Sequence, residues 1–95
     1  MKCINLNHWY IKNNVLSISL MRYYVKINIC ESMKCILFKL EVINCEREVI
    51  SFDFYNLEEA IYFTEVIISK CENFEEIIKK YREIFVADNL QLNRR

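Results

Sequence analysis

The sequence predicts an α+β fold, in which an antiparallel sheet of about four strands is followed by two helices packed on one of its faces. Apolar residues recur at every second position through much of residues 14–54, as in strands that bury one face. From residue 57 onward they recur at the three- and four-residue spacing of a helix. Strands followed by helices in a chain of this length favour a single α+β domain over residues 1–95.

The strand region divides into four short runs separated by polar turns. Because the runs follow one another closely, they are expected to pair antiparallel, since parallel crossovers need a dozen or more residues. Ile4 and Leu6 suggest a further strand that ends at a turn formed by residues 12–14. The chain has no glycine, so its tight turns are expected to use Asn, Asp or Ser. The predicted inward-facing residues are Leu16, Ile18, Leu20, Met21, Tyr23, Val25, Ile27, Ile29, Ile36, Phe38, Leu40, Val42, Ile50, Phe52 and Phe54.

Two helices are predicted, over residues 57–71 and 74–86. Each follows an asparagine, Asn56 or Asn73, with a glutamate three residues later, which is typical of a capped helix start. Tyr62 and Phe63 widen the apolar arc of the first helix beyond its core stripe. Either this helix is sandwiched between the sheet and the second helix, or part of the arc is a contact surface. Residues 88–95 are polar and are expected to fray.

The composition points to a reducing cytoplasmic setting in a bacterial host cell. The five cysteines, an odd number, are best interpreted as reduced thiols. No apolar run approaches the roughly 20 residues that span a bilayer, and residues 1–8 lack the features of a signal peptide. Ile, Asn, Lys, Tyr and Phe fill 44 of the 95 positions, which suggests coding by an A/T-rich genome such as that of a low-GC bacterium, its phages or its plasmids.

Charge is unevenly distributed although the net charge is zero. Residues 1–40 carry six bases and one acid, whereas residues 41–76 carry ten acids and two bases. Acids at the two helix starts are explained by the helix dipole. The others predict a contact with a host protein or complex that presents a basic surface. With the two aromatic residues of the first helix, the predicted partner-binding residues are Glu41, Glu46, Glu48, Asp53, Glu65, Glu72, Tyr62 and Phe63.

Two other kinds of partner stay open. Basic residues on the early strands lie near Trp9, Tyr10, Tyr23 and Tyr24, and such a surface can stack and hold single-stranded nucleic acid. No recognition-module motif accompanies them, so a nucleic-acid-binding or regulatory protein is the alternative function. The second alternative is a structural homo-oligomer, such as a homodimer formed through the first helix or an edge strand.

The residues that carry chemistry argue against an enzyme. His8 is the only histidine, and the chain offers it no nucleophile elbow or glycine-rich phosphate loop. Cys30 and Cys35 have no second close ligand pair, as a structural zinc site would require. The sequence therefore predicts no catalytic residue, no metal site and no cofactor.

The segment from Glu48 to Ile61 runs from a strand into a helix with an acidic start, reading EVISFDFYNLEEAI. This plan, over about residues 34–86, resembles that of small phage-encoded anti-CRISPR proteins, which are compact and often acidic. The resemblance implies a phage or mobile-element inhibitor that blocks a host defence complex of the CRISPR-Cas kind by stoichiometric binding. It is architectural, so it transfers no functional residue. The zero net charge departs from the strongly acidic proteins that mimic nucleic acid.

Overall fold

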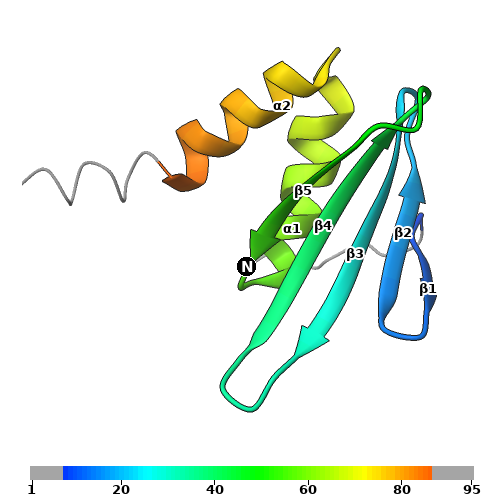
Figure 1. The fold of residues 1–95 in the computed structure, drawn as a ribbon. Coiled ribbons are helices and arrows are strands. Elements are labelled where there is room, and N and C mark those ends of the chain that lie inside the picture. Colours follow the sequence, from blue (N-terminus) through cyan, green and yellow to red (C-terminus); the bar gives the residue numbers. More distant parts are fainter. Residues whose placement is uncertain (1–7, 87–95) are drawn as a thin grey trace, which may run out of the picture.

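The computed structural model describes residues 8–86, which form a five-stranded antiparallel sheet followed by two helical segments (Figure 1). The strands lie in chain order across the sheet. The predicted fold class is confirmed, with one strand more than expected. Three predictions concern residues outside this range: the reduced thiol of Cys3, one of the five cysteines, the strand at Ile4 and Leu6, and the frayed tail 88–95. The strands are β1 (Tyr10–Lys12), β2 (Val15–Ser19), β3 (Tyr23–Glu31), β4 (Ile36–Asn44) and β5 (Val49–Phe54).

Asparagine supplies the tightest turn of the sheet. Asn13 and Asn14 join β1 to β2 with φ angles of 52° and 65°. Two consecutive positive φ values are those of the two-residue hairpin turn whose twist matches that of its strands. Asparagine tolerates this region because its side chain hydrogen-bonds the local backbone. Arg47, in the β4–β5 turn, departs from the expectation, since it takes a φ of 69° with a long side chain.

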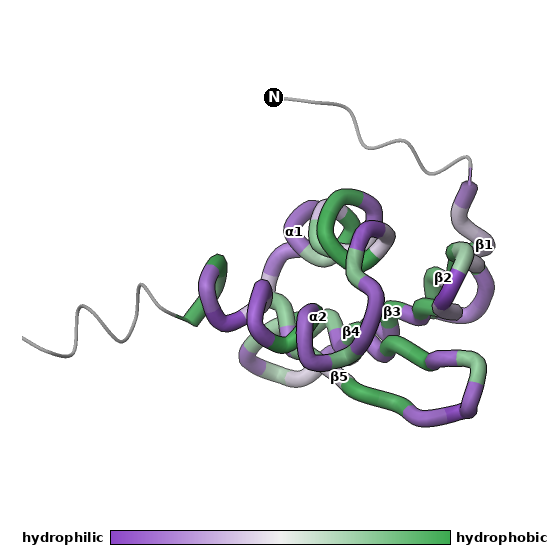
Figure 2. Tube along the Cα trace, turned by 90° about the horizontal axis from the view of Figure 1, so that it is seen from above, coloured by the Kyte–Doolittle hydropathy of each residue, from purple (hydrophilic) through white to green (hydrophobic). Residues whose placement is uncertain are grey.

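The two predicted helices are confirmed to within a residue, and each changes its winding along its length. The first begins as α1 (Leu57–Tyr62) and continues through a π-helical turn, η1 (Phe63–Ile67), and a 3₁₀ turn, η2 (Ile68–Lys70). The second begins as α2 (Phe74–Tyr81) and continues as a π-helical turn, η3 (Arg82–Val86). Seen from above, α1 stands to one side of the strands (Figure 2).

Asparagine caps fix both helix starts, as the sequence predicts. The side-chain oxygen of Asn56 accepts a hydrogen bond from the Glu59 backbone N–H at 3.1 Å. Asn73 does the same for the N–H of Glu76 at 2.9 Å. The Glu76 carboxylate also reaches back to accept from the N–H of Glu72 at 2.8 Å. Backbone donors that a helix start leaves unpaired are thereby satisfied.

Replacing Asn73 with alanine is expected to lower the free energy of unfolding by about 1 kcal/mol, because it removes this cap. Urea denaturation at neutral pH measures the change. Asn73→Asp is the matched control, since aspartate caps about as well as asparagine and should hold the free energy near that of the wild type. Equal losses in the two variants would show that the cap is not responsible.

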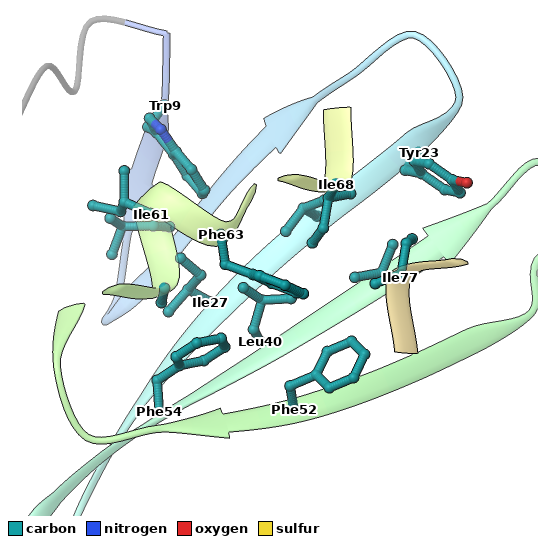
Figure 3. Packing of buried hydrophobic residues seen from close by; sticks show 14 of the residues in the cluster. Trp9, Tyr23, Ile27, Leu40, Phe52, Phe54, Ile61, Phe63, Ile68 and Ile77 are labelled. Carbon is teal, nitrogen blue, oxygen red and sulfur yellow. The ribbon is translucent and has the colours of Figure 1, made fainter. Parts of the chain in front are cut away.

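One hydrophobic cluster joins the sheet to both helices, and Phe63 lies at its centre (Figure 3). Its side chain is 0% exposed, and its ring lies 5.6 Å from that of Phe52 and 5.7 Å from that of Phe54. Tyr81 packs on the same rings from the second helix, at 4.5 Å from Phe52. The prediction that Phe63 contacts a partner is therefore wrong. The sandwiched arrangement, the other alternative left by the sequence, explains its burial.

Most residues predicted to face inward do so, and the predictions for Met21 and for Ile36, which is 47% exposed at the start of β4, are wrong. Val25, Ile27, Leu40 and Val42 are fully buried. Met21 is 93% exposed because it lies in the turn between β2 and β3. In this turn the Leu20 N–H donates a hydrogen bond to the Tyr23 carbonyl at 2.7 Å.

No helix among residues 8–86 has the length and apolar character needed to cross a membrane.

Candidate functional site

One face of the sheet is not covered by any element among residues 8–86. The buried residues of the central strands face the helices, so the residues that alternate with them point to the other side. We call this surface the outer face. Its side chains are those of Tyr10, Lys12, Val15, Ser17, Ser19, Tyr24, Lys26, Asn28, Cys30, Leu37, Lys39, Glu41, Ile43, Val49, Ser51 and Asp53.

An apolar row crosses one end of the outer face. Tyr24 on β3 lies opposite Ile43 on β4, and Ile43 lies opposite Val49 on β5. Tyr24 is 42% exposed and Val49 54% exposed, with Ile43 half-buried between them. Side chains directly opposite on neighbouring strands have Cβ atoms about 5 Å apart, so the three form one continuous surface.

Charged residues of both signs alternate beside this row. Lys26 lies opposite Glu41, and Lys39 lies opposite Asp53. The Asn28 side-chain amide donates to Glu41 at 3.3 Å, which orients that carboxylate. Each central lysine of the outer face thus has a carboxylate as its cross-strand neighbour. The potential of the face is mixed and does not form a basic platform.

The predicted partner-binding acids do not form one surface. Glu41 and Asp53 lie on the outer face. Glu46 and Glu48, in the β4–β5 turn region, line a surface cavity of about 550 Å³ together with Glu72 from the connection between the helices. At this end of the sheet the structure brings together three of the six predicted acids.

The remaining predicted residues lie elsewhere in the helical layer. Glu65 accepts a hydrogen bond from the Trp9 indole N–H at 2.7 Å, which ties the segment before β1 to the first helix. Tyr62 is 51% exposed and lines a shallow depression with residues from the start of the first helix and with Ile84 and Phe85 of η3. None of the six predicted acids lines this depression.

A cleft of about 770 Å³ opens at the edge of the sheet where β1 stops short of the end of β2. It extends around the β2 edge, from the outer face to the side of the helices. We call it the edge cleft. Its lining residues are His8, Tyr10, Ser17, Ile18, Ser19, Leu20, Tyr24 and Glu65.

Buried hydroxyl and thiol groups are held in their protonated forms. Burial raises the pKa of the Tyr23 phenol, which donates a hydrogen bond to the Cys71 carbonyl at 3.1 Å. Burial, and then the Glu76 carboxylate, raise the pKa of the Cys71 thiol. A nucleophilic cysteine needs a lowered pKa, so the environment of Cys71 is that of a structural residue.

The other described cysteines, Cys30, Cys35 and Cys45, are free and exposed. No group of three or more His, Cys, Asp or Glu residues in the 8–86 range is arranged to hold a metal ion. Within the same range, every buried side-chain nitrogen or oxygen has a hydrogen-bond partner. No unpaired polar atom in the described core marks a ligand position.

Sequence reasoning missed the apolar row and the edge cleft. Tyr24 is not among the residues predicted to face inward, but its alignment with Ile43 and Val49 depends on strand register. The edge cleft depends on the short length of β1, which periodicity does not reveal over three residues.

Comparison of the chain with protein-family models, curated proteins and solved structures finds no match.

Proposed function

We propose that this protein acts without catalysis, by binding another protein through the outer face of its sheet. The apolar row of Tyr24, Ile43 and Val49 carries the proposal, because it is exposed on a face without a covering layer among residues 8–86. Protein interfaces commonly place aromatic and aliphatic side chains at the centre with a polar rim around them. The alternating charges of Lys26, Glu41 and their neighbours supply such a rim.

Tyr24→Ser and Val49→Ser are each expected to lower the affinity for the partner by about tenfold or more, as for residues at an interface centre. Tyr62→Ser is the matched control, since Tyr62 has a similar exposure but lies in the helical layer. The partner is identified by affinity capture from a low-GC bacterial lysate, with the wild type and the three variants used in parallel. It is the protein lost with Val49→Ser and retained with Tyr62→Ser, and its affinity is then measured by calorimetry.

The opposite pattern, in which only Tyr62→Ser loses the partner, would assign the interface to the helices and refute the proposal. A homodimer seen by light scattering and dissociated by Val49→Ser would assign the outer face to a second copy of the chain.

A nucleic-acid partner is favoured less than a protein, because Lys26 and Lys39 each have a carboxylate residue opposite them on the neighbouring strand. Salt-dependent RNA or DNA binding that is lost in Tyr24→Ser would overturn the choice of a protein partner.

The narrower proposal is an inhibitor from a phage or another mobile element that blocks a bacterial defence complex of the CRISPR-Cas kind. The resemblance of the strand–helix plan, the small size and the A/T-rich composition support it. Glu46, Glu48 and Glu72 offer a basic partner a local acidic surface despite the zero net charge. Addition of the protein to a purified CRISPR nuclease complex should stop target cleavage at a one-to-one ratio. Cleavage that persists at large molar excess contradicts inhibition of that complex.

A further inference from the structure

The edge cleft contains a stretch of β2 backbone that β1 does not pair. The pairing of β1 with β2 ends at Tyr10 and Ser17, whereas β2 continues to Ser19. Hydrogen-bonding directions alternate along an antiparallel strand, and the Leu20 N–H points toward β3, where it bonds Tyr23. The N–H and C=O of Ser19 therefore point the other way, into the edge cleft. Within residues 8–86, no residue of β1 lies opposite Ser19.

A carboxylate stands on the helix side of this open edge. Among residues 8–86, Glu65 is the only acidic residue that lines the edge cleft. One of its oxygens, Oε2, accepts from the Trp9 indole at 2.7 Å, which holds the carboxylate in place. Its second oxygen makes no hydrogen bond to any of residues 8–86 and is available to a donor. A cationic side chain would complement this charge, and a guanidinium group also matches the planar geometry of a carboxylate.

The two sides of the edge cleft would recognise alternate residues of an added strand. Ile18 and Leu20 pack against the core, so a residue placed opposite Leu20 would point toward the helices and Glu65. Its neighbours would point to the outer face, where Tyr10 and Tyr24 present exposed rings. Apolar side chains pack well against such rings. The preferred pattern is therefore an arginine between two apolar residues.

We propose that the edge cleft binds an extended segment of a partner protein, which adds to the open edge of β2 and places an arginine against Glu65. Backbone hydrogen bonds to Ser19 would supply part of the affinity, and the alternate side chains would supply specificity. The inference rests on the proposed function only in taking the ligand to be a protein segment. It assigns this segment to a site different from the apolar row, although Tyr24 borders both.

Titration with the peptide acetyl-Val-Arg-Val-amide, followed by ¹⁵N NMR, tests the proposal. Saturable shifts are expected at the Ser17 and Ser19 amides and at the Trp9 indole N–H. The same peptide with citrulline in place of arginine should bind about tenfold more weakly, because citrulline keeps the shape and loses the charge. Shifts absent from these three groups, or equal affinities for the two peptides, would overturn the proposal.

Two glutamate variants show whether Glu65 is responsible. Glu65→Gln should lower the affinity for the arginine peptide about tenfold and leave the affinity for the citrulline peptide unchanged. The variant should keep its local structure, since glutamine can still accept a hydrogen bond from Trp9 through its amide oxygen. Glu58→Gln, an exposed position at the start of α1, should change neither affinity. An unchanged arginine affinity in Glu65→Gln contradicts the assignment. Val49→Ser should leave peptide binding intact, so that failure of the edge cleft and failure of the outer face are distinguishable.

Discussion

Replacing Phe63 with alanine is expected to lower the free energy of unfolding by about 3–5 kcal/mol, the usual cost of removing a buried phenylalanine ring. The ring packs against aromatic side chains from both the sheet and the second helix, at 5.6 Å from Phe52 and 5.7 Å from both Tyr81 and Phe85. Its removal leaves a cavity that these neighbours fill only by moving together. Because a small domain has a total stability of roughly 5–15 kcal/mol, the loss is a large part of it.

Urea denaturation measures this loss, with Tyr62→Ala as the matched control. Tyr62 precedes Phe63 in the chain but is 51% exposed, so its replacement should cost less than about 1 kcal/mol. If Phe63→Ala does not fold, Phe63→Leu retains most of the apolar volume and should cost about 1.5 kcal/mol. Comparable losses at positions 62 and 63 would contradict the central place of Phe63 in the core.

The strands and helices were predictable because local chemistry agrees with the final fold. The alternation through Tyr23, Val25 and Ile27 and the caps at Asn56 and Asn73 both persist in the structure. The sequence predicted a further strand that ends at a turn of residues 12–14, and β1 ends at this turn, but its three exposed residues carry too little pattern to locate the strand themselves. It forms because the turn at residues 13–14 returns the chain along β2. Its pairing is a consequence of turn geometry more than of its own sequence.

Phe63 was misassigned because it lies beside the predicted core stripe of the first helix and not within it. The stripe that includes Leu57, Ala60 and Ile61 covers one side of a regular helix. In the structure the helix widens into a π-helical turn at Phe63, where both Phe63 and Thr64 are fully buried. The buried arc is wider than one stripe because this helix meets the sheet and the second helix together.

The candidate site was less predictable, because it depends on which residues of different strands lie opposite one another. Acid-rich sequence predicted one acidic surface, yet Glu41 points from the sheet, Glu65 from the first helix and Glu72 from the connection after it. A charge excess along the chain does not specify a face. The row through Tyr24 and Val49 depends on two registers, which the turn conformations set.

Stability is expected to fall as the pH rises above about 9, because the buried Tyr23 and Cys71 and the partly buried Tyr81 resist ionisation in the folded protein. Burial raises the pKa values of Tyr23, Cys71 and Tyr81 above ordinary values of 10.0 for the phenols and 9.0 for the thiol. Each group also donates a hydrogen bond to a backbone carbonyl, which its ionised form could not do. The folded state thus keeps protons that the unfolded chain releases.

The direction of the effect follows from linkage between proton binding and folding. Well below pH 9 these three groups are protonated in both states and add no pH dependence. As the pH passes the ordinary values of 9.0 and then 10.0, the unfolded chain binds fewer protons than the folded one. The free energy of unfolding therefore decreases with pH until the raised pKa of each group is reached. Urea denaturation between pH 8 and pH 11 measures this slope.

Tyr23→Phe separates the contribution of one group from the total. The variant loses the hydrogen bond to the Cys71 carbonyl, so it should be about 1 kcal/mol less stable than the wild type at neutral pH. Its stability should nevertheless fall less steeply above pH 9, because phenylalanine has no proton to release. Tyr62→Phe, at an exposed position without such a buried contact, should retain the wild-type slope. If the free energy of unfolding falls with pH at the same slope in the wild type and in Tyr23→Phe, the Tyr23 phenol ionises as readily in the folded protein as in the unfolded chain. Its burial between β3 and the end of the first helix would then not hold its proton.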